Sequence, residues 1–200
     1  MKLIVGISGA SGVIMGYRLM QILRSMDDIE THLVMSDSAA KNFDYEVGLD
    51  INKVIELADN YHDVRNMAAT ISSGSFRTDG MIVLPCSMKS LAAIAMGMDL
   101  NLLIRAANVC LKEERRVVLV PREMPLGRAH LKNMLTANEN GCIILPPMLT
   151  FYNMSLTSEQ QIVHVIGKIL MQFGLDLPQF LPWEGIGTPT NIIIDEENGQ

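Results

Sequence analysis

One stretch near the start of the chain, residues 2–18 (KLIVGISGASGVIMGYR), constrains the fold more than any other. It opens with an apolar run, residues 3–7, of the kind found in a parallel strand that is buried on both faces. Small residues follow, and apolar residues return with helical spacing from Val13 to Leu23. The stretch therefore predicts a buried strand, a tight turn and a helix in succession.

The turn between this strand and this helix consists almost wholly of small residues. Gly6, Gly9 and Gly12 let the backbone approach a ligand where a Cβ atom would collide with it. The N-terminus of the following helix favours an anion such as phosphate. Two better-known motifs fail, because a dinucleotide fingerprint needs glycine at Ser8 and a nucleophile elbow needs glycine at Ala10. The turn is interpreted as a phosphate-binding turn for a mononucleotide, and a glycine-rich turn that binds nothing is the alternative.

Composition limits the classes of protein to which the chain can belong. Its 200 residues are 48% hydrophobic and 19% charged, which is typical of one soluble globular domain. The net charge is -6 and the basic residues are scattered, so a nucleic acid is not an expected partner. No apolar run approaches the ~18 residues of a membrane helix. We expect a single domain over residues 1–184 and an acidic tail over residues 185–200.

The cysteines and histidines indicate neither a disulfide framework nor a metal site. Cys86, Cys110 and Cys142 have no C-x-x-C spacing, and an odd count without a signal peptide predicts reduced thiols in the cytoplasm. The four histidines are far apart in the sequence and lack ligand spacing, so metal catalysis is not expected. Cys86 follows a predicted strand as a possible nucleophile, but no histidine or cation is near it in sequence. A buried structural thiol is the favoured interpretation.

The arrangement of apolar runs along the chain predicts the fold class. Five runs, at residues 3–7, 30–35, 80–84, 117–120 and 142–145, are each followed by helical spacing. This alternation predicts an α/β, Rossmann-like three-layer fold, with a parallel sheet and helices on both faces. The least regular region holds short helical patterns at residues 54–58 and 64–69, and a further short strand is possible at residues 70–72.

Polar residues follow the predicted strands at the edge where parallel strands end, which is where ligands bind in such sheets. Arg122 and Glu123 lie between two prolines at that edge, which favours a functional role over a structural ion pair. The candidates are hydroxyls, cations, carboxylates and aromatic rings: Ser8, Ser11, Ser36, Ser87, Ser90, Arg105, Lys112, Arg122, Lys168, Glu46, Glu123, Tyr152 and Trp183. The cations exceed the needs of one mononucleotide, so a second phosphate-bearing ligand is expected.

Several long motifs, in order, carry a resemblance to a known family. They are GISGASG, SSGSFRTDGMIVLPCSMKSLAAI, NLLIRAANVCLKEERRVVLVPREMP followed by HLKNML, and LPPMLTFYN. From about residue 2 to Trp183 the chain closely resembles the UbiX-type flavin prenyltransferases, including paralogues that are named as one subunit of aromatic or phenolic acid decarboxylases. Position 168 is lysine, whereas many members of that family have arginine there.

The resemblance implies a homo-oligomeric, commonly dodecameric, metal-independent enzyme. It would join the dimethylallyl group of dimethylallyl phosphate to N5 and C6 of reduced FMN, making the prenylated FMN that a UbiD-type decarboxylase uses. By the same resemblance, FMN would be bound by Gly9, Ala10, Ser11, Ser36, Ser87, Met88, Lys89, Ser90 and Arg105. The prenyl phosphate would be bound by Lys112, Arg122, Tyr152 and Lys168. Catalysis would involve Glu46, Glu123, Lys112 and Trp183, with the two glutamates beside the reacting flavin.

Two alternatives remain open at this point. One is an FMN-dependent cysteine decarboxylase, a class that has a catalytic histidine after the first helix and a P-A-S-A-N-T stretch. This chain has no such histidine and has Pro85-Cys86-Ser87-Met88 in place of that stretch. The other is a carrier that binds FMN without chemistry, as an accessory subunit of an aromatic acid decarboxylase. The acidic and basic residues named for the prenyl site argue against a carrier.

Overall fold

The structure is a computed structural model that describes residues 1–153, 155, 157–183 and 185. The expected boundary between domain and tail falls at residue 184, and residues 184 and 186–200 lie outside the described part, so that division stays a prediction. Within the described part, no helix combines the length and the apolar character that crossing a bilayer requires.

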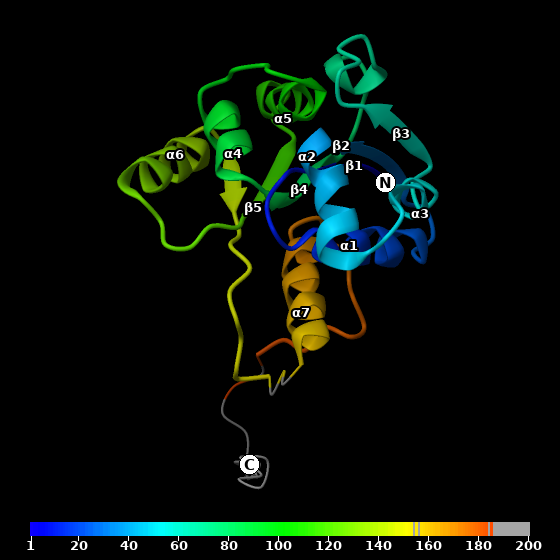
Figure 1. Cartoon of the computed structure of the whole chain (residues 1–200), viewed down its shortest axis with the longest axis vertical. Helices are drawn as coiled ribbons and strands as arrows, with labels where there is room; N and C mark the ends of the chain where they lie inside the picture. The colour runs from blue at the N-terminus through cyan, green and yellow to red at the C-terminus, as the bar shows by residue number, and fades with distance from the viewer. Residues whose placement is uncertain (154, 156, 184, 186–200) are drawn as a thin grey trace, which may run out of the picture.

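A parallel six-stranded sheet forms the centre of the described chain (Figure 1). Its strands are β1 Lys2–Ile7, β2 Glu30–Met35, β3 Asn60–Asp63, β4 Gly80–Cys86, β5 Arg116–Pro121 and β6 Cys142–Ile144. The order across the sheet is β3-β2-β1-β4-β5-β6. The chain first adds strands on one side of β1 and then on the other, so the direction of winding reverses between β1 and β4. Parallel sheets bind ligands at such a switch point, beyond the carboxyl ends of the strands.

The helices lie on both faces of the sheet and enclose two apolar cores. They are α1 Val13–Arg24, α2 Asp37–Asn42, the π-helix η1 Phe43–Val47, α3 Ile51–Ile55, the 3-10 helix η2 Thr70–Ser72, α4 Met88–Ala95, α5 Leu102–Lys112, α6 Arg128–Glu139 and α7 Ser158–Met171. Residues of α1, α2, α3 and α7 pack in one core, and residues of α4, α5 and α6 pack in the other. The predicted three-layer α/β fold is confirmed.

The local differences from the sequence prediction have physical causes. β3 was not predicted because its sequence, NYHD, is polar, and it forms an outer strand that pairs only with β2. The possible strand at residues 70–72 is the 3-10 helix η2, and the helical pattern at 64–69 forms turns instead. β4 continues through Pro85, where its register with β5 shifts, and such an irregularity accommodates a residue that has no N–H.

The segment between β6 and α7 extends away from the body of the sheet, and α7 returns toward it (Figure 1). We call residues 145–157 the arm loop. It exposes large apolar side chains, including Met148, Leu149 and Phe151, each with more than two thirds of its surface accessible. The helix that follows begins after Thr157 with a capping box, in which Thr157 and Gln160 exchange hydrogen bonds of 3.2 and 3.0 Å.

Candidate functional site

A buried serine joins the two turns on either side of the switch point. Ser8, which is 1% exposed, follows β1, and its hydroxyl donates to the carbonyl of Pro85 in β4 at 3.0 Å. The same hydroxyl oxygen accepts the N–H of Ser87 at 2.7 Å. The glycine turn and the turn after β4 are therefore held together by one side chain. Ser8 therefore has a structural role, because its hydroxyl is used in hydrogen bonds to the backbone of Pro85 and Ser87.

Three helices begin beside one another at this edge, which we call the carboxyl edge of the sheet. Ser36 follows β2 and caps α2 by accepting the N–H of Ala39 at 3.2 Å. Ser87 follows β4 and caps α4 by accepting the N–H of Ser90 at 3.2 Å, while its hydroxyl donates to the Ser90 hydroxyl at 3.0 Å. Together with α1, which follows β1, these helices begin at the switch point, and helix N-termini of this kind offer backbone N–H groups to which an anion can bind.

The glycine turn packs tightly against α2. A Cβ atom on Gly9 would lie 2.3 Å from the Cβ of Ser38, so only glycine fits there without movement. Gly12 has a φ of 94°, in the left-handed region that glycine adopts without strain. Ala10 is nearly buried, and its carbonyl accepts a hydrogen bond of 3.2 Å from the Asn42 amide. Ser11 is exposed at the tip of the turn.

Both glutamates that the resemblance implies lie at the carboxyl edge. Glu46, on the π-helix η1, accepts the N–H of Gly12 at 2.8 Å, so its carboxylate lies at the glycine turn. Glu123 follows β5 and is exposed, and its carboxylate accepts the N–H of Met124 at 3.1 Å. The backbone N–H of Arg122 donates to the carbonyl of Cys86 at 3.2 Å, which fixes the Arg122–Glu123 pair beside the end of β4.

The other cations are distributed over different parts of the chain. Arg105, on α5, donates to the Ser72 carbonyl at 3.1 Å and to Asp99 at 2.7 Å, and so connects α5 to the polar segment before β4. Lys112 is paired with Glu113 at the C-terminal end of α5, only a few residues before β5 begins. It therefore lies at the amino edge of the sheet, opposite the serines. Within one chain, the fold does not bring Lys112 together with the carboxyl edge.

Tyr152, Trp183 and Lys168 belong to a separate group around α7 and the arm loop. The Tyr152 and Trp183 rings meet edge to face, with centroids 5.3 Å apart. Lys168 is exposed on α7. His164 lies one turn earlier, and its pKa is lowered by burial and by the charge of Lys168. His164 also contacts Tyr152, with a ring separation of 5.7 Å. Sequence reasoning missed His164, because its partners come from a loop whose path the sequence does not define.

The cysteines behave as structural thiols. Cys86, Cys110 and Cys142 are all free and buried. Burial raises the pKa of the Cys86 thiol far above its ordinary value, and burial raises the pKa of Cys142 to about 12. Thiols with such pKa values stay protonated at neutral pH and are poor nucleophiles. This supports the structural interpretation of Cys86.

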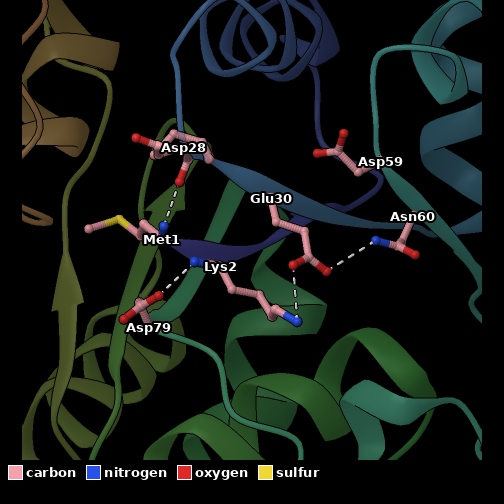
Figure 2. A pocket seen from close by; sticks show the side chains of 8 residues that line it. Met1, Lys2, Asp28, Glu30, Asp59, Asn60 and Asp79 are labelled. Atoms are coloured by element: carbon pink, nitrogen blue, oxygen red, sulfur yellow. Dashed lines mark hydrogen bonds and ion pairs between the residues drawn. The ribbon is translucent and has the colours of Figure 1, made fainter.

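A cavity of about 630 Å³ lies at the opposite, amino edge, and it is not suited to a phosphate (Figure 2). Its lining includes the acidic residues Asp28, Glu30, Asp59 and Asp79. Lys2 forms an ion pair of 3.1 Å with Glu30, and its backbone N–H donates to Asp79 at 2.6 Å. The hydrogen bond from Lys2 lowers the pKa of the Glu30 carboxyl. The negative lining repels phosphates, so this cavity is not a candidate for the nucleotide.

The strand order, the switch point and the three helix N-termini define an α/β protein of the phosphate-binding, nucleotide-cofactor class. The family model described as Flavoprotein matches residues 1–173. A "Probable UbiX-like flavin prenyltransferase" from Sedimentibacter hydroxybenzoicus is 59% identical over 185 residues, which cover 92% of this chain and 98% of the relative. The chain belongs to the UbiX-like flavin prenyltransferases.

Two solved structures are similar over nearly the whole chain. The dodecameric FMN-dependent UbiX-like decarboxylase from Escherichia coli O157:H7 is 51% identical with a TM-score of 0.91, and the match covers 92% of this chain and all of that one. AnUbiX (PadA1), solved in complex with FMN and dimethylallyl pyrophosphate, is 45% identical with a TM-score of 0.90, and the match covers 93% of this chain and 98% of that one.

Proposed function

We propose that this protein is a flavin prenyltransferase, which joins the dimethylallyl group of dimethylallyl phosphate to N5 and C6 of reduced FMN. One observation carries the proposal. The chain places three helix N-termini at the switch point, two of them capped by serines, and a relative with the same fold was solved with FMN and dimethylallyl pyrophosphate. Backbone N–H groups and hydroxyls are the donors that the FMN phosphate requires. The donor set therefore fits FMN.

Reduced FMN, when bound, supplies the nucleophilic N5 and C6 atoms. The chain's own residues have three tasks in this scheme. Arg122 and Lys168 bind the phosphate of the prenyl substrate and stabilise the charge that develops as its C–O bond breaks. The Trp183 ring, held edge to face by Tyr152, stabilises the positive charge on the allylic carbon. Glu123 accepts the proton that the C6 position loses when the second bond forms.

The scheme combines residues that lie in different parts of one chain: Arg122 and Glu123 at the carboxyl edge, Lys112 at the amino edge, and the group of Tyr152, Trp183 and Lys168 around α7. The arm loop also exposes apolar side chains such as Leu149 and Phe151. We therefore propose that the protein is a homo-oligomer, with the dodecamer of the Escherichia coli O157:H7 relative as the expected size. Contacts between subunits then complete the pocket with residues from more than one chain.

We further propose that the product, prenylated FMN, is passed to a UbiD-type decarboxylase that acts on aromatic or related unsaturated acids. The support is the UbiX-like family of the chain. A cytoplasmic location is also proposed, since the described cysteines are all free thiols, as expected in a reducing compartment.

The proposal is tested by mixing the protein anaerobically with reduced FMN and dimethylallyl phosphate and measuring the mass of the released flavin. A gain of one C5 prenyl unit is expected. Unchanged FMN, with the flavin demonstrably bound, would overturn the proposal in favour of an FMN carrier. Unchanged FMN in this assay, together with release of CO2 from a C-terminal cysteine peptide in a separate assay that supplies oxidised FMN as the electron acceptor, would favour a cysteine decarboxylase.

Substitution of Glu123 separates an enzyme from a carrier. Glu123→Gln removes the base, so the rate of prenyl transfer is expected to fall by about 100-fold or more, while FMN binds as before. Glu139→Gln is the matched control, because Glu139 is exposed at the end of α6 and belongs to no proposed site. Equal rates for the two variants would exclude the proposed role of Glu123.

A further inference from the structure

His164 is held at both of its ring nitrogens by the arm loop. It lies on α7, and its side chain is 6% exposed. Its Nδ1 is 2.9 Å from the Asn153 amide nitrogen, and its Nε2 is 3.4 Å from the Tyr152 hydroxyl. None of the sequence motifs and none of the proposed catalytic steps accounts for this residue.

The partners of His164 determine which nitrogen carries the hydrogen. The Asn153 carbonyl oxygen accepts the N–H of Ser155 at 3.3 Å, which leaves the NH2 group of Asn153 facing the ring. An amide NH2 can only donate, so Nδ1 of His164 must accept. Burial lowers the pKa of His164, and the charge of Lys168 lowers it further, so the ring is neutral near pH 7. A neutral ring that accepts at Nδ1 carries its hydrogen at Nε2.

This tautomer sets the direction of the Tyr152 hydroxyl. Nε2–H of His164 donates to the Tyr152 oxygen, so the hydrogen of Tyr152 points away from His164. The Tyr152 side chain is 48% exposed, and its hydroxyl hydrogen is therefore available to an acceptor from outside the cluster. The hydroxyl is a donor with a fixed direction, which suits an acceptor-only group such as a phosphate oxygen.

The backbone on both sides of Tyr152 is also fixed. The Gln161 side chain accepts the N–H of Thr150 at 2.9 Å and donates to the carbonyls of Thr150 at 2.7 Å and Ser155 at 2.8 Å. Phe180 packs against the His164 ring with a centroid distance of 5.0 Å. The position of the His164 ring relative to Tyr152 is therefore fixed.

We propose that His164 is a positioning residue, which holds the Tyr152 hydroxyl as a hydrogen-bond donor to a phosphate oxygen of the prenyl substrate. The inference rests on the proposed function and deepens it, because it assigns the orientation of one phosphate ligand to a residue that does not itself touch the substrate. Loss of one hydrogen bond to a charged phosphate is expected to weaken binding by about tenfold.

The test measures the dissociation constant of dimethylallyl phosphate by calorimetry, using the assembled protein loaded with oxidised FMN. The transfer reaction needs reduced FMN, so binding is read apart from chemistry. His164→Phe keeps a ring but removes the donor, and it is expected to weaken binding about tenfold, as Tyr152→Phe does. The double variant should bind no more weakly than Tyr152→Phe alone. His164→Gln retains an amide donor and should bind within about threefold of the unaltered protein.

Each outcome decides the proposal. The affinity for FMN should be the same in all variants, because the FMN site lies at the carboxyl edge. Additive losses in the double variant would mean that His164 supports the loop as a whole, and the proposal would fail. Equal binding by His164→Phe and the unaltered protein would also overturn it. In that case the proposed function would still hold, provided that the unaltered protein transfers the prenyl group. An unaltered protein that neither binds nor transfers the prenyl group would overturn both.

Discussion

Gly9→Ala is the substitution that best tests how the glycine turn makes a flavin site. A Cβ atom at this position would lie 2.3 Å from the Cβ of Ser38, whereas ordinary contact begins near 3.4 Å. The Ser38 Cβ is bonded directly to the backbone of α2, so no side-chain rotation can move it away. The turn and the start of α2 must therefore separate by about 1 Å.

The cost of this separation follows from the packing. Overpacking of a close contact lowers the free energy of unfolding by about 1–3 kcal/mol. Replacement of glycine by alanine raises it by about 0.4–1 kcal/mol, because alanine reduces the conformational entropy of the unfolded chain. The Gly9 backbone lies outside the left-handed region, so alanine adds no backbone strain. A net loss of about 1–2 kcal/mol is expected. The movement displaces the N-termini of α1 and α2 from one another, so FMN should bind about 5- to 30-fold more weakly.

FMN binding is measured by quenching of flavin fluorescence, and stability is measured by urea unfolding without FMN. Gly127→Ala is the matched control, because its Cβ would meet only the His130 ring nitrogen, at 3.8 Å. That variant should keep its FMN affinity. If Gly9→Ala binds FMN as tightly as the unaltered protein, the close approach of the turn to α2 has no part in the site, and the reasoning is refuted.

Two further predictions concern stability. Burial lowers the pKa values of His32 and His62, whose facing ring nitrogens are 3.0 Å apart, so the unfolded chain binds more protons than the folded one below about pH 6.5. The free energy of unfolding, measured by urea titration, should therefore fall as the pH is lowered from 7.5 to 5.5. It should fall less steeply in His62→Gln than in the unaltered protein, and an equal dependence on pH in the two proteins would contradict this. Gly167→Ala places a Cβ 2.3 to 2.6 Å from three carbons of Phe180, so it should lower the free energy of unfolding by about 1–2 kcal/mol despite a gain of ~1 kcal/mol in helix propensity. A more stable Gly167→Ala variant would show that Phe180 moves aside at no cost.

The strands that were predicted and the strand that was missed differ in one property. The predicted strands are apolar because helices cover both of their faces, as residues 3–7 and 117–120 illustrate. β3 is an outer strand whose side chains alternate between half-buried and exposed, so its four residues carry no apolar signal. Its place in the sheet comes from backbone pairing with β2, which only the folded chain displays.

The candidate site divides in a similar way. The sequence placed Ser36 and Ser87 at the carboxyl edge, because each comes soon after a predicted apolar strand, and the structure adds that each caps the helix that follows it. The role of His164 was not predicted. Its partners Tyr152 and Asn153 are 12 and 11 residues away in sequence, and only the path of the arm loop brings them to its ring.

The sequence by itself determined the parallel α/β architecture and the residues available to bind an anion, because apolar periodicity and glycine, serine and proline chemistry are local properties. Only the tertiary structure decided the order of the strands, which sets β1 between β2 and β4 and so brings the Ser36 and Ser87 caps to either side of the glycine turn. It also decided that Lys112 lies at the opposite edge. Strand order depends on how the helical crossovers pack over the whole sheet, and no local segment of sequence contains that information.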